Sequence, residues 1–190
     1  MTELGLIVLA VVAVAALLLV GVVVGLYNGL VRVKNAVDES WADIDTELRR
    51  RYDLIPNLIE TVKGYAAHEK ETLQRVIEAR NVAVANHGSP ASQAQDENLL
   101  VGSLRQLFAL AESYPDLKAN QNFLNLQSEL ANTEDRLQRS RRFYNANVRD
   151  LNNRLEVFPS NMVAQMFAFQ PREYFEVEEA AVREAPAVKF

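Results

Sequence analysis

The sequence predicts an all-α protein, in which an N-terminal transmembrane helix precedes an elongated antiparallel four-helical bundle with coiled-coil-like packing. Three observations support this fold class. Residues 4–26 carry no charged or hydrogen-bonding side chain. The 190 residues contain only 7 glycines and 6 prolines, so the chain is poor in residues that interrupt helices. Apolar residues after the first segment recur at steps of three, four and seven, as they do in packed helices.

Residues 1–26 are predicted to form a retained membrane anchor. At about 1.5 Å per residue, the apolar run covers roughly 35 Å, which exceeds a hydrocarbon core of about 30 Å. A lone apolar segment in lipid satisfies its backbone only as a helix. The alternatives are a cleaved signal peptide and a buried core helix. The lead Thr2-Glu3 lacks the basic residues of a signal peptide, and the segment has no polar stripe of the kind a core helix usually shows.

The flanks of the anchor predict its orientation. Arg32 and Lys34 follow the apolar segment closely, whereas Glu3 is the one charged side chain before it. The positive-inside rule then places the short N-terminus outside and the bundle in the cytoplasm, in the inner membrane of the cell. Tyr27 suits the interface between lipid and water.

Residues 27–158 are predicted to form the bundle. An apolar stripe continues past Pro56 to about Ala85, so we expect one helix with a kink at Pro56, whose two halves give two rods. Asn28-Gly29 could be a hinge or part of a continuous helix. The first part of the stripe consists of Val37, Trp41, Ile44, Leu48, Tyr52, Ile55, Ile59, Val62 and Ala66.

Two further rods are expected after a loop at residues 87–95. One helix covers about 96–113 with Asp96 as its N-cap, and a longer one covers about 118–157. Ser160 is expected to cap a short helix to about Phe167, and residues 159–190 form a C-terminal segment that ends in an extended tail or a docked arm. The apolar residues spaced by seven in the long helix are Phe123, Leu130, Leu137, Tyr144, Leu151 and Phe158.

The sequence offers little chemistry. There is no cysteine, and the two histidines, His68 and His87, have no glutamate three residues before them, so no metal site or cofactor is expected. No phosphate-binding loop or nucleophile motif occurs. The net charge of −5 argues against nucleic acid as a partner. These observations predict a protein that is not an enzyme.

Several residues are candidates for contacts with a second copy or another partner. Gly21 and Gly25 have the spacing that lets two membrane helices approach closely. Arginine clusters could pair with carboxylates of a neighbouring acidic helix face, although pairing within one helix and a solvated face are the simpler interpretations. The charged candidates are Arg49, Arg50, Arg51, Arg139, Arg141, Arg142, Asp38, Asp43 and Asp45.

Six blocks together resemble the bacterial LemA family. They are Arg50–Leu58, Val62–Ala66, Tyr114–Ala119, Arg141–Asn145, Phe158–Asn161 and Pro171–Phe175. The resemblance implies a membrane-anchored antiparallel helical bundle with a short outside N-terminus, and no assigned catalytic residue. It also implies a link to a membrane metalloprotease of the HtpX type.

Two functions from different classes are therefore predicted. In the first, the protein is a non-enzymatic scaffold that is tethered to the lipid bilayer, self-associates as a homo-oligomer and presents a helical surface to partners. In the second, it is an accessory or adaptor subunit of a membrane protease in envelope stress or quality control.

Overall fold

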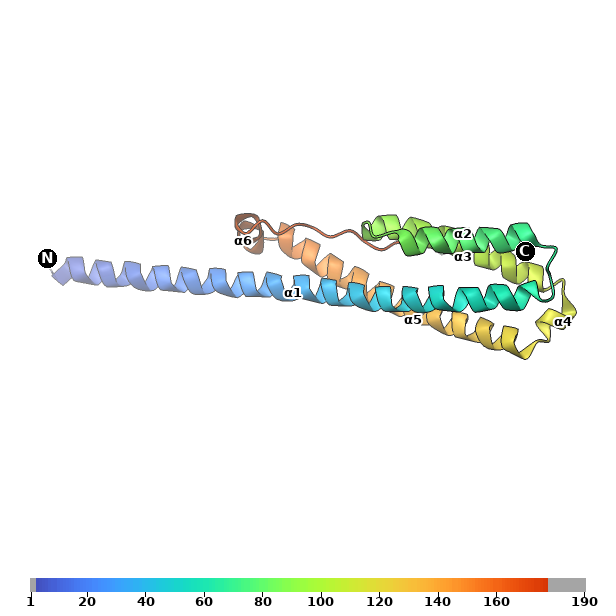
Figure 1. Cartoon of the computed structure of the whole chain (residues 1–190). Coiled ribbons are helices and arrows are strands. Elements are labelled where there is room, and N and C mark those ends of the chain that lie inside the picture. The colour runs from blue at the N-terminus through green and yellow to red at the C-terminus, as the bar shows by residue number, and fades with distance from the viewer. Residues whose placement is uncertain (1–2, 178–190) are drawn as a thin grey trace, which may run out of the picture. The chain divides into compact units, whose positions relative to one another are not determined.

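The protein is helical through most of the residues that the structure describes, which are 3–177 (Figure 1). This computed structural model has no strand in that range. The all-α class and the long N-terminal apolar helix predicted from the sequence are confirmed. The helices are α1 (Glu3–Lys63), α2 (Lys70–Ala85), α3 (Pro90–Ala111), α4 (Pro115–Lys118), α5 (Gln121–Glu156) and α6 (Ser160–Met166).

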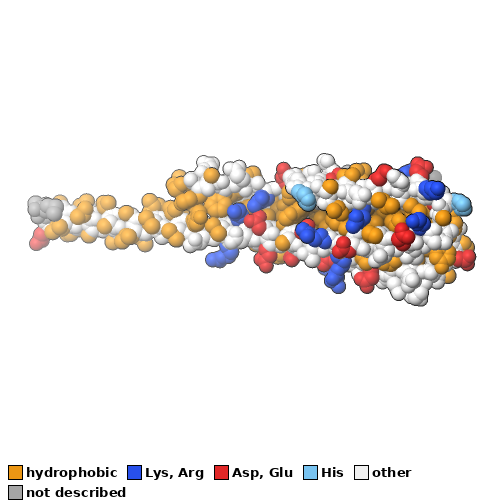
Figure 2. All heavy atoms as spheres, in the orientation of Figure 1, with side chains coloured by type: hydrophobic (Ala, Val, Ile, Leu, Met, Phe, Trp, Pro, Cys, Tyr) orange, Lys and Arg blue, Asp and Glu red, His pale blue; other side chains and the backbone are white. Residues whose placement is uncertain are grey.

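The apolar N-terminal part of α1 is exposed. Its most apolar window of 18 residues has a mean hydropathy of 3.3, and none of that window is buried inside the protein. Leu4, at its start, and Leu17, near its middle, are 71% and 72% exposed. Figure 2 shows hydrophobic side chains along this segment. Within residues 3–177, α1 is the one helix whose length and composition allow it to cross a membrane.

The chain forms two compact units, and each is built from segments that are far apart in the sequence. The first unit contains residues 1–41 and 143–172, and the second contains residues 42–142 and 173–190. Helices α1 and α5 contribute to both units. The two units are described separately below.

In the first unit, residues 30–41 of α1 pack against the end of α5. The ring centroids of Trp41 and Tyr144 lie 5.3 Å apart. Asn147 Nδ2 donates to the Ala36 carbonyl and to Ser40 Oγ, each at 3.2 Å, so polar groups between the helices are satisfied. The buried apolar residues of this unit are Leu30, Val37, Tyr144, Val148, Leu151, Val163 and Ala164.

Helix α6 packs on α1 where the apolar segment ends. The Tyr27 ring lies 4.7 Å from the ring of Phe167 and 5.8 Å from that of Phe169. A buried cluster lies beside these rings, so α6 is fixed to the last turns of the apolar segment. The cluster consists of Leu30, Val163 and Ala164, with Val23, Leu26, Tyr27, Leu155 and Phe169 packed against it.

The end of α6 is closed by a left-handed residue, Ala168, with φ of 55°. The N–H of Phe169 donates to the Ala164 carbonyl at 3.0 Å, and the N–H of Ala168 donates to the Gln165 carbonyl at 3.2 Å. This pair of hydrogen bonds satisfies carbonyls that the last helical turn leaves free. The hydrogen bonds and the packing of Phe169 offset the steric cost of a side chain in this conformation.

The chain that follows α6 is docked on the first unit at Arg172. Its N–H donates to Asn152 Oδ1 and its carbonyl accepts from Asn152 Nδ2, both at 3.0 Å. Its guanidinium lies 2.8 Å from Asp38 Oδ1. The alternative of a docked arm therefore holds for this part of the C-terminal segment.

In the second unit, residues 42–63 of α1, helices α2 and α3, and residues 121–142 of α5 share one apolar core. Helices α2 and α3 pack side by side and are joined by a short loop. Phe175 is fully buried in this unit, and Arg141 donates to the Val177 carbonyl at 2.9 Å, so residues 173–177 are also docked. The rest of the expected tail, residues 178–190, lies outside the described residues. The core includes Ile44, Leu48, Ile55, Leu58, Val62, Leu73, Val76, Leu100, Leu107, Leu117, Phe123, Leu130 and Leu137.

The expected kink at Pro56 does not divide the first helix into two rods. Helix α1 runs through Pro56 to Lys63, and the chain turns at residues 64–69 before α2. Pro56 has no N–H, so the carbonyl of Tyr52 lacks its helical partner. Arg80 of α2 supplies one, because its Nε donates to the Tyr52 carbonyl at 2.7 Å. The helix continues because a neighbouring helix satisfies the carbonyl that proline leaves free.

Two predicted helix starts are also corrected. Helix α3 begins at Pro90 and not at Asp96, because Ser89 is the N-cap and proline suits the first helical position. Ser89 Oγ accepts from the N–H of Ser92 at 3.4 Å. Ser160 is not the N-cap of α6, which is Pro159. The Ser160 hydroxyl donates instead to the carbonyls at the end of α5, and its Oγ lies 2.7 Å from the Arg154 carbonyl oxygen.

The residues spaced by seven in α5 are buried up to the end of that helix. Phe158 is 73% exposed because α5 ends at Glu156, and the spacing no longer places it on the buried face. The buried members are Phe123, Leu130, Leu137, Tyr144 and Leu151.

The contact between Arg80 and the Tyr52 carbonyl gives a first prediction. Arg80→Met should lower the free energy of unfolding by about 1–2 kcal/mol, because it leaves a part-buried carbonyl without a donor. In a Pro56→Ala background the cost should fall below about 0.5 kcal/mol, because the new N–H donates to the same carbonyl. Urea unfolding of the full chain in detergent, followed by circular dichroism, measures both values.

Arg75→Met is the matched control on the same helix. Arg75 is exposed and pairs with Glu71 one turn away, so its loss should change the free energy of unfolding by less than about 0.5 kcal/mol. An equal cost of Arg80→Met with and without Pro56 would contradict this account of the helix.

Candidate functional site

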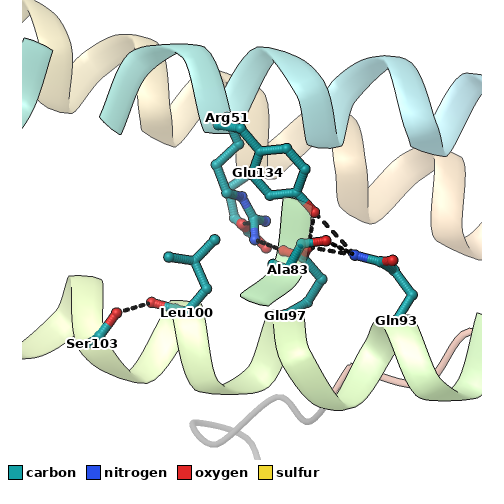
Figure 3. A network of polar contacts seen from close by, with 8 residues as sticks. Arg51, Ala83, Gln93, Glu97, Leu100, Ser103 and Glu134 are labelled. Atoms are coloured by element: carbon teal, nitrogen blue, oxygen red, sulfur yellow. Dashed lines mark hydrogen bonds and ion pairs between the residues drawn. The ribbon is translucent and has the colours of Figure 1, made fainter. Parts of the chain in front are cut away.

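A buried charged network lies inside the second unit, between α1, α3 and α5 (Figure 3). The side chains of Arg51 and Glu97 are 3% and 0% exposed. Arg51 Nη1 donates to Glu97 Oε2 at 2.8 Å, and its Nη2 donates to Glu134, whose side chain is 39% exposed. One guanidinium therefore pairs with carboxylates from two other helices.

The second oxygen of Glu97 is also satisfied. Tyr52 OH donates to Glu97 Oε1, and Gln93 Nε2 lies 3.2 Å from the same atom. The Gln93 amide also lies 3.0 Å from Tyr52 OH and donates to the Ala83 carbonyl at 3.1 Å. Because Ala83 belongs to α2, the network contacts all four long helical segments of the second unit.

Burial raises the pKa of the Tyr52 phenol, and the neighbouring Glu97 carboxylate raises it further. The phenol therefore keeps its proton at neutral pH and acts as a hydrogen-bond donor to Glu97. A guanidinium, a phenol and an amide all donate to one carboxylate, which is the arrangement that makes a buried charge tolerable. This geometry joins neighbouring helices inside the unit through buried hydrogen bonds and ion pairs.

The described residues contain no group of three or more histidine, cysteine, aspartate or glutamate side chains that could hold a metal ion. His68 and His87 are both exposed. The arrangement that the structure does bring together is thus a set of donors around Glu97.

Arg51 corrects the sequence-based assignment most clearly. The sequence predicts it as a surface contact for another copy or another partner, but its side chain is buried and paired with Glu97 and Glu134 of its own chain. The apolar stripe of α1 carries it inward, because it lies three residues after Leu48 and four before Ile55. It is removed from the surface candidates.

The other charged candidates lie at the surface or are partly buried. Arg49 pairs with Asp45 at 2.9 Å, Asp38 pairs with Arg172, and Arg141 holds the Val177 carbonyl. These contacts are within one unit and do not test a role toward partners. The exposed candidates of the second unit are Asp43, Arg49, Arg50, Arg139 and Arg142.

Gly21 and Gly25 lie on an open face of α1. A Cβ placed at either residue would meet no atom within 4 Å. Both positions are exposed in the single chain, so the helix can be approached closely at this face. A second helix at this face stays a prediction.

Sequence reasoning missed Glu97, Gln93 and Glu134. A signal was present, because Gln93 and Glu97 occupy the same helical stripe as Leu100 and Leu104. A carboxylate on one apolar stripe and an arginine on another, Arg51, form a complementary pair. Glu134 carries a weaker signal, because it is only half-buried beside the stripe of α5.

Glu97→Gln should destabilise the second unit by about 2–4 kcal/mol, because it leaves the buried Arg51 with only the half-exposed Glu134 as a charged partner. The double variant Arg51→Met/Glu97→Met should lose less free energy of unfolding than Arg51→Met and Glu97→Met lose together when each is made alone, since neither buried charge then remains. Urea unfolding of the full chain in detergent gives the free energies. Glu60→Gln, at an exposed pair with Lys63, is the control and should change them by less than about 0.5 kcal/mol.

The raised pKa of Tyr52 predicts a loss of stability at alkaline pH. The folded state favours the protonated phenol, because the pKa of Tyr52 is higher there than the value of about 10 in the unfolded chain. This contribution to stability is fully present below a pH of about 10 and is lost as the pH rises from there toward the folded-state pKa. The wild-type free energy of unfolding should fall by up to about 1.4 kcal/mol per pH unit more steeply than that of Tyr52→Phe. Unfolding curves between pH 8 and about 11.5 measure the slopes.

Tyr65→Phe, which removes a phenol that is 44% exposed, is the matched control substitution for the alkaline series. Equal slopes for wild type and Tyr52→Phe would show that ionisation of Tyr52 is not linked to unfolding.

Comparison with known proteins places these features in a family. The model of the LemA family matches residues 40–190. Protein LemA of Metamycoplasma hominis is 30% identical over 148 residues, which cover 76% of this chain and 66% of that protein. Magnetosome protein MamQ 2 of Paramagnetospirillum magneticum is 25% identical over 179 residues, which cover 81% of this chain and 66% of that protein.

Magnetosome protein MamQ of Magnetospirillum gryphiswaldense is 22% identical over 174 residues, with 78% of this chain and 64% of that protein covered. The chain thus spans about two thirds of the length of these relatives. None of the three names states an enzymatic activity. The family match includes the buried network, since Arg51, Glu97 and Glu134 all lie within residues 40–190. With most of its length matched by the family model, this chain belongs to the LemA family.

Proposed function

We propose that the protein is a membrane-tethered helical scaffold that self-associates and presents a helical surface to partners. The observation that carries this proposal is the closed network around Glu97. Every polar group of Glu97 and Arg51 that the network uses is paired with another helix of the same unit. The buried charges are paired with one another inside the unit, and contacts with other molecules are left to the surface.

The exposed charges supply that surface. Arg139 and Arg142 lie one turn apart on α5 and are exposed, and Asp43 is exposed on α1. Arginine forks pair bidentately with carboxylates, so such residues suit contacts between acidic and basic helix faces. Gly21 and Gly25 add an open face within the apolar segment.

The proposal includes an orientation. Arg32 and Lys34 follow the apolar segment and favour a cytoplasmic location for the residues after it, with the short N-terminus outside and the anchor in the inner membrane. Both flanking residues are exposed on α1, as residues near a membrane surface should be.

Self-association is tested on the full chain extracted in detergent. Its mass should be a multiple of the 21.3 kDa of one chain, and Arg139→Glu should weaken the association by about tenfold in dissociation constant. Arg105→Glu, a charge reversal at another exposed arginine of the second unit, is the matched control and should have little effect. A particle of one chain at every concentration would count against the scaffold.

The alternative function, an adaptor of a membrane protease, predicts a different partner when the chain is purified from native membranes. An adaptor of a membrane protease would be recovered with the protease in a one-to-one ratio when the full chain is purified through an affinity tag. Recovery of the chain with further copies of itself supports the scaffold instead.

A further inference from the structure

The surface of the first unit carries an exposed apolar patch around α6. Five side chains form it, and four of them are more than half exposed. We name it the α6 patch: Val157 (60% exposed), Phe158 (73%), Met162 (61%), Met166 (71%) and Phe167 (48%). A patch of large apolar and aromatic side chains on one surface marks a site of contact with another molecule or with a membrane.

The position of the patch along α1 is fixed by packing. Residues Val163 and Ala164, on the buried side of α6, contact the cluster that includes Val23, Leu26 and Leu30. These α1 residues span about 10 Å along the helix axis. The apolar run ends at Leu26, so α6 lies where a membrane-spanning α1 passes from hydrocarbon into the headgroup region.

The charge pattern agrees with that depth. No aspartate, glutamate, lysine or arginine occurs from Val157 to Pro171, whereas Glu156 and Arg172 stand directly on either side. On α1 the nearest charges after the apolar run are Arg32 and Lys34. At the level where α6 packs on α1, neither helix therefore carries a charged side chain.

We propose that the α6 patch is a second membrane contact, in which α6 lies in the interface of the bilayer with Phe158, Met162 and Met166 turned into the lipid. Aromatic and apolar side chains on one face of a short interfacial element bind at this depth. The patch is continuous with the exposed apolar surface of α1 (Figure 2), and the bilayer that covers the one also covers the other. The inference depends on α1 crossing the membrane and does not depend on self-association.

The absence of native cysteine allows a direct test. The full chain with Met166→Cys carries a polarity-sensitive fluorophore and is reconstituted into phosphatidylcholine vesicles with or without spin-labelled lipid. Spin-labelled lipid should lower its emission by about half, as expected for a side chain at the acyl boundary. Met162→Cys provides a second position on the patch. Ala146→Cys, exposed on α5 of the same unit, should show no quenching by lipid, and Val12→Cys reports the membrane span itself.

Two results would overturn the inference. Quenching of the label at 166 by aqueous iodide and not by lipid would place the patch in water. A label shielded from both quenchers would place it against protein, such as a second copy. In either case quenching at position 12 by lipid shows that the span is intact, so failure of the patch is distinguished from failure of the anchor.

Discussion

The buried pair of Arg51 and Glu97 is the constraint on which the second unit depends. Removing two charges from water costs several kcal/mol per ion, so the pair adds little net stability over an apolar contact. The pair instead disfavours other packing arrangements of the helices, because a helix that slips by one turn leaves a guanidinium or a carboxylate unpaired. Donors from α1 and α3 meet on Glu97, and Gln93 of α3 donates to the Ala83 carbonyl of α2, so the network around the pair favours one mutual register of these helices.

The same requirement explains why α1 is not broken inside this unit. Pro56 removes one backbone donor and leaves the Tyr52 carbonyl without its helical partner. Arg80 donates to this carbonyl instead. Tyr52 is therefore held at both ends, with its carbonyl against α2 and its phenol against Glu97 of α3. A single residue links the continuity of α1 to the charged network, because both depend on every buried polar group finding a partner.

Periodicity in the sequence was enough to predict the class, the N-terminal apolar helix and the long helix α5, because these depend on many residues that act in the same direction. It failed where one long-range contact decides, as at Pro56. It also failed where polar residues lie on an apolar stripe, since Arg51 and Glu97 look like surface residues until their helices are paired. The start of α3 was misplaced for a local reason: Ser89-Pro90 is a strong helix start, but the polar residues after it resemble a loop.

The first unit has no buried ion pair of this kind among its described contacts, and its register rests on apolar packing and on amides such as Asn147. Lipid surrounds a single membrane helix equally on all sides, so such a helix can change its depth and tilt at little cost. A patch on α6, fixed beside Tyr27, restricts both changes when it enters the interface, because the patch and the apolar part of α1 must then reach their own levels of the bilayer together. The faces of the apolar segment that do not carry α6 stay open to other helices.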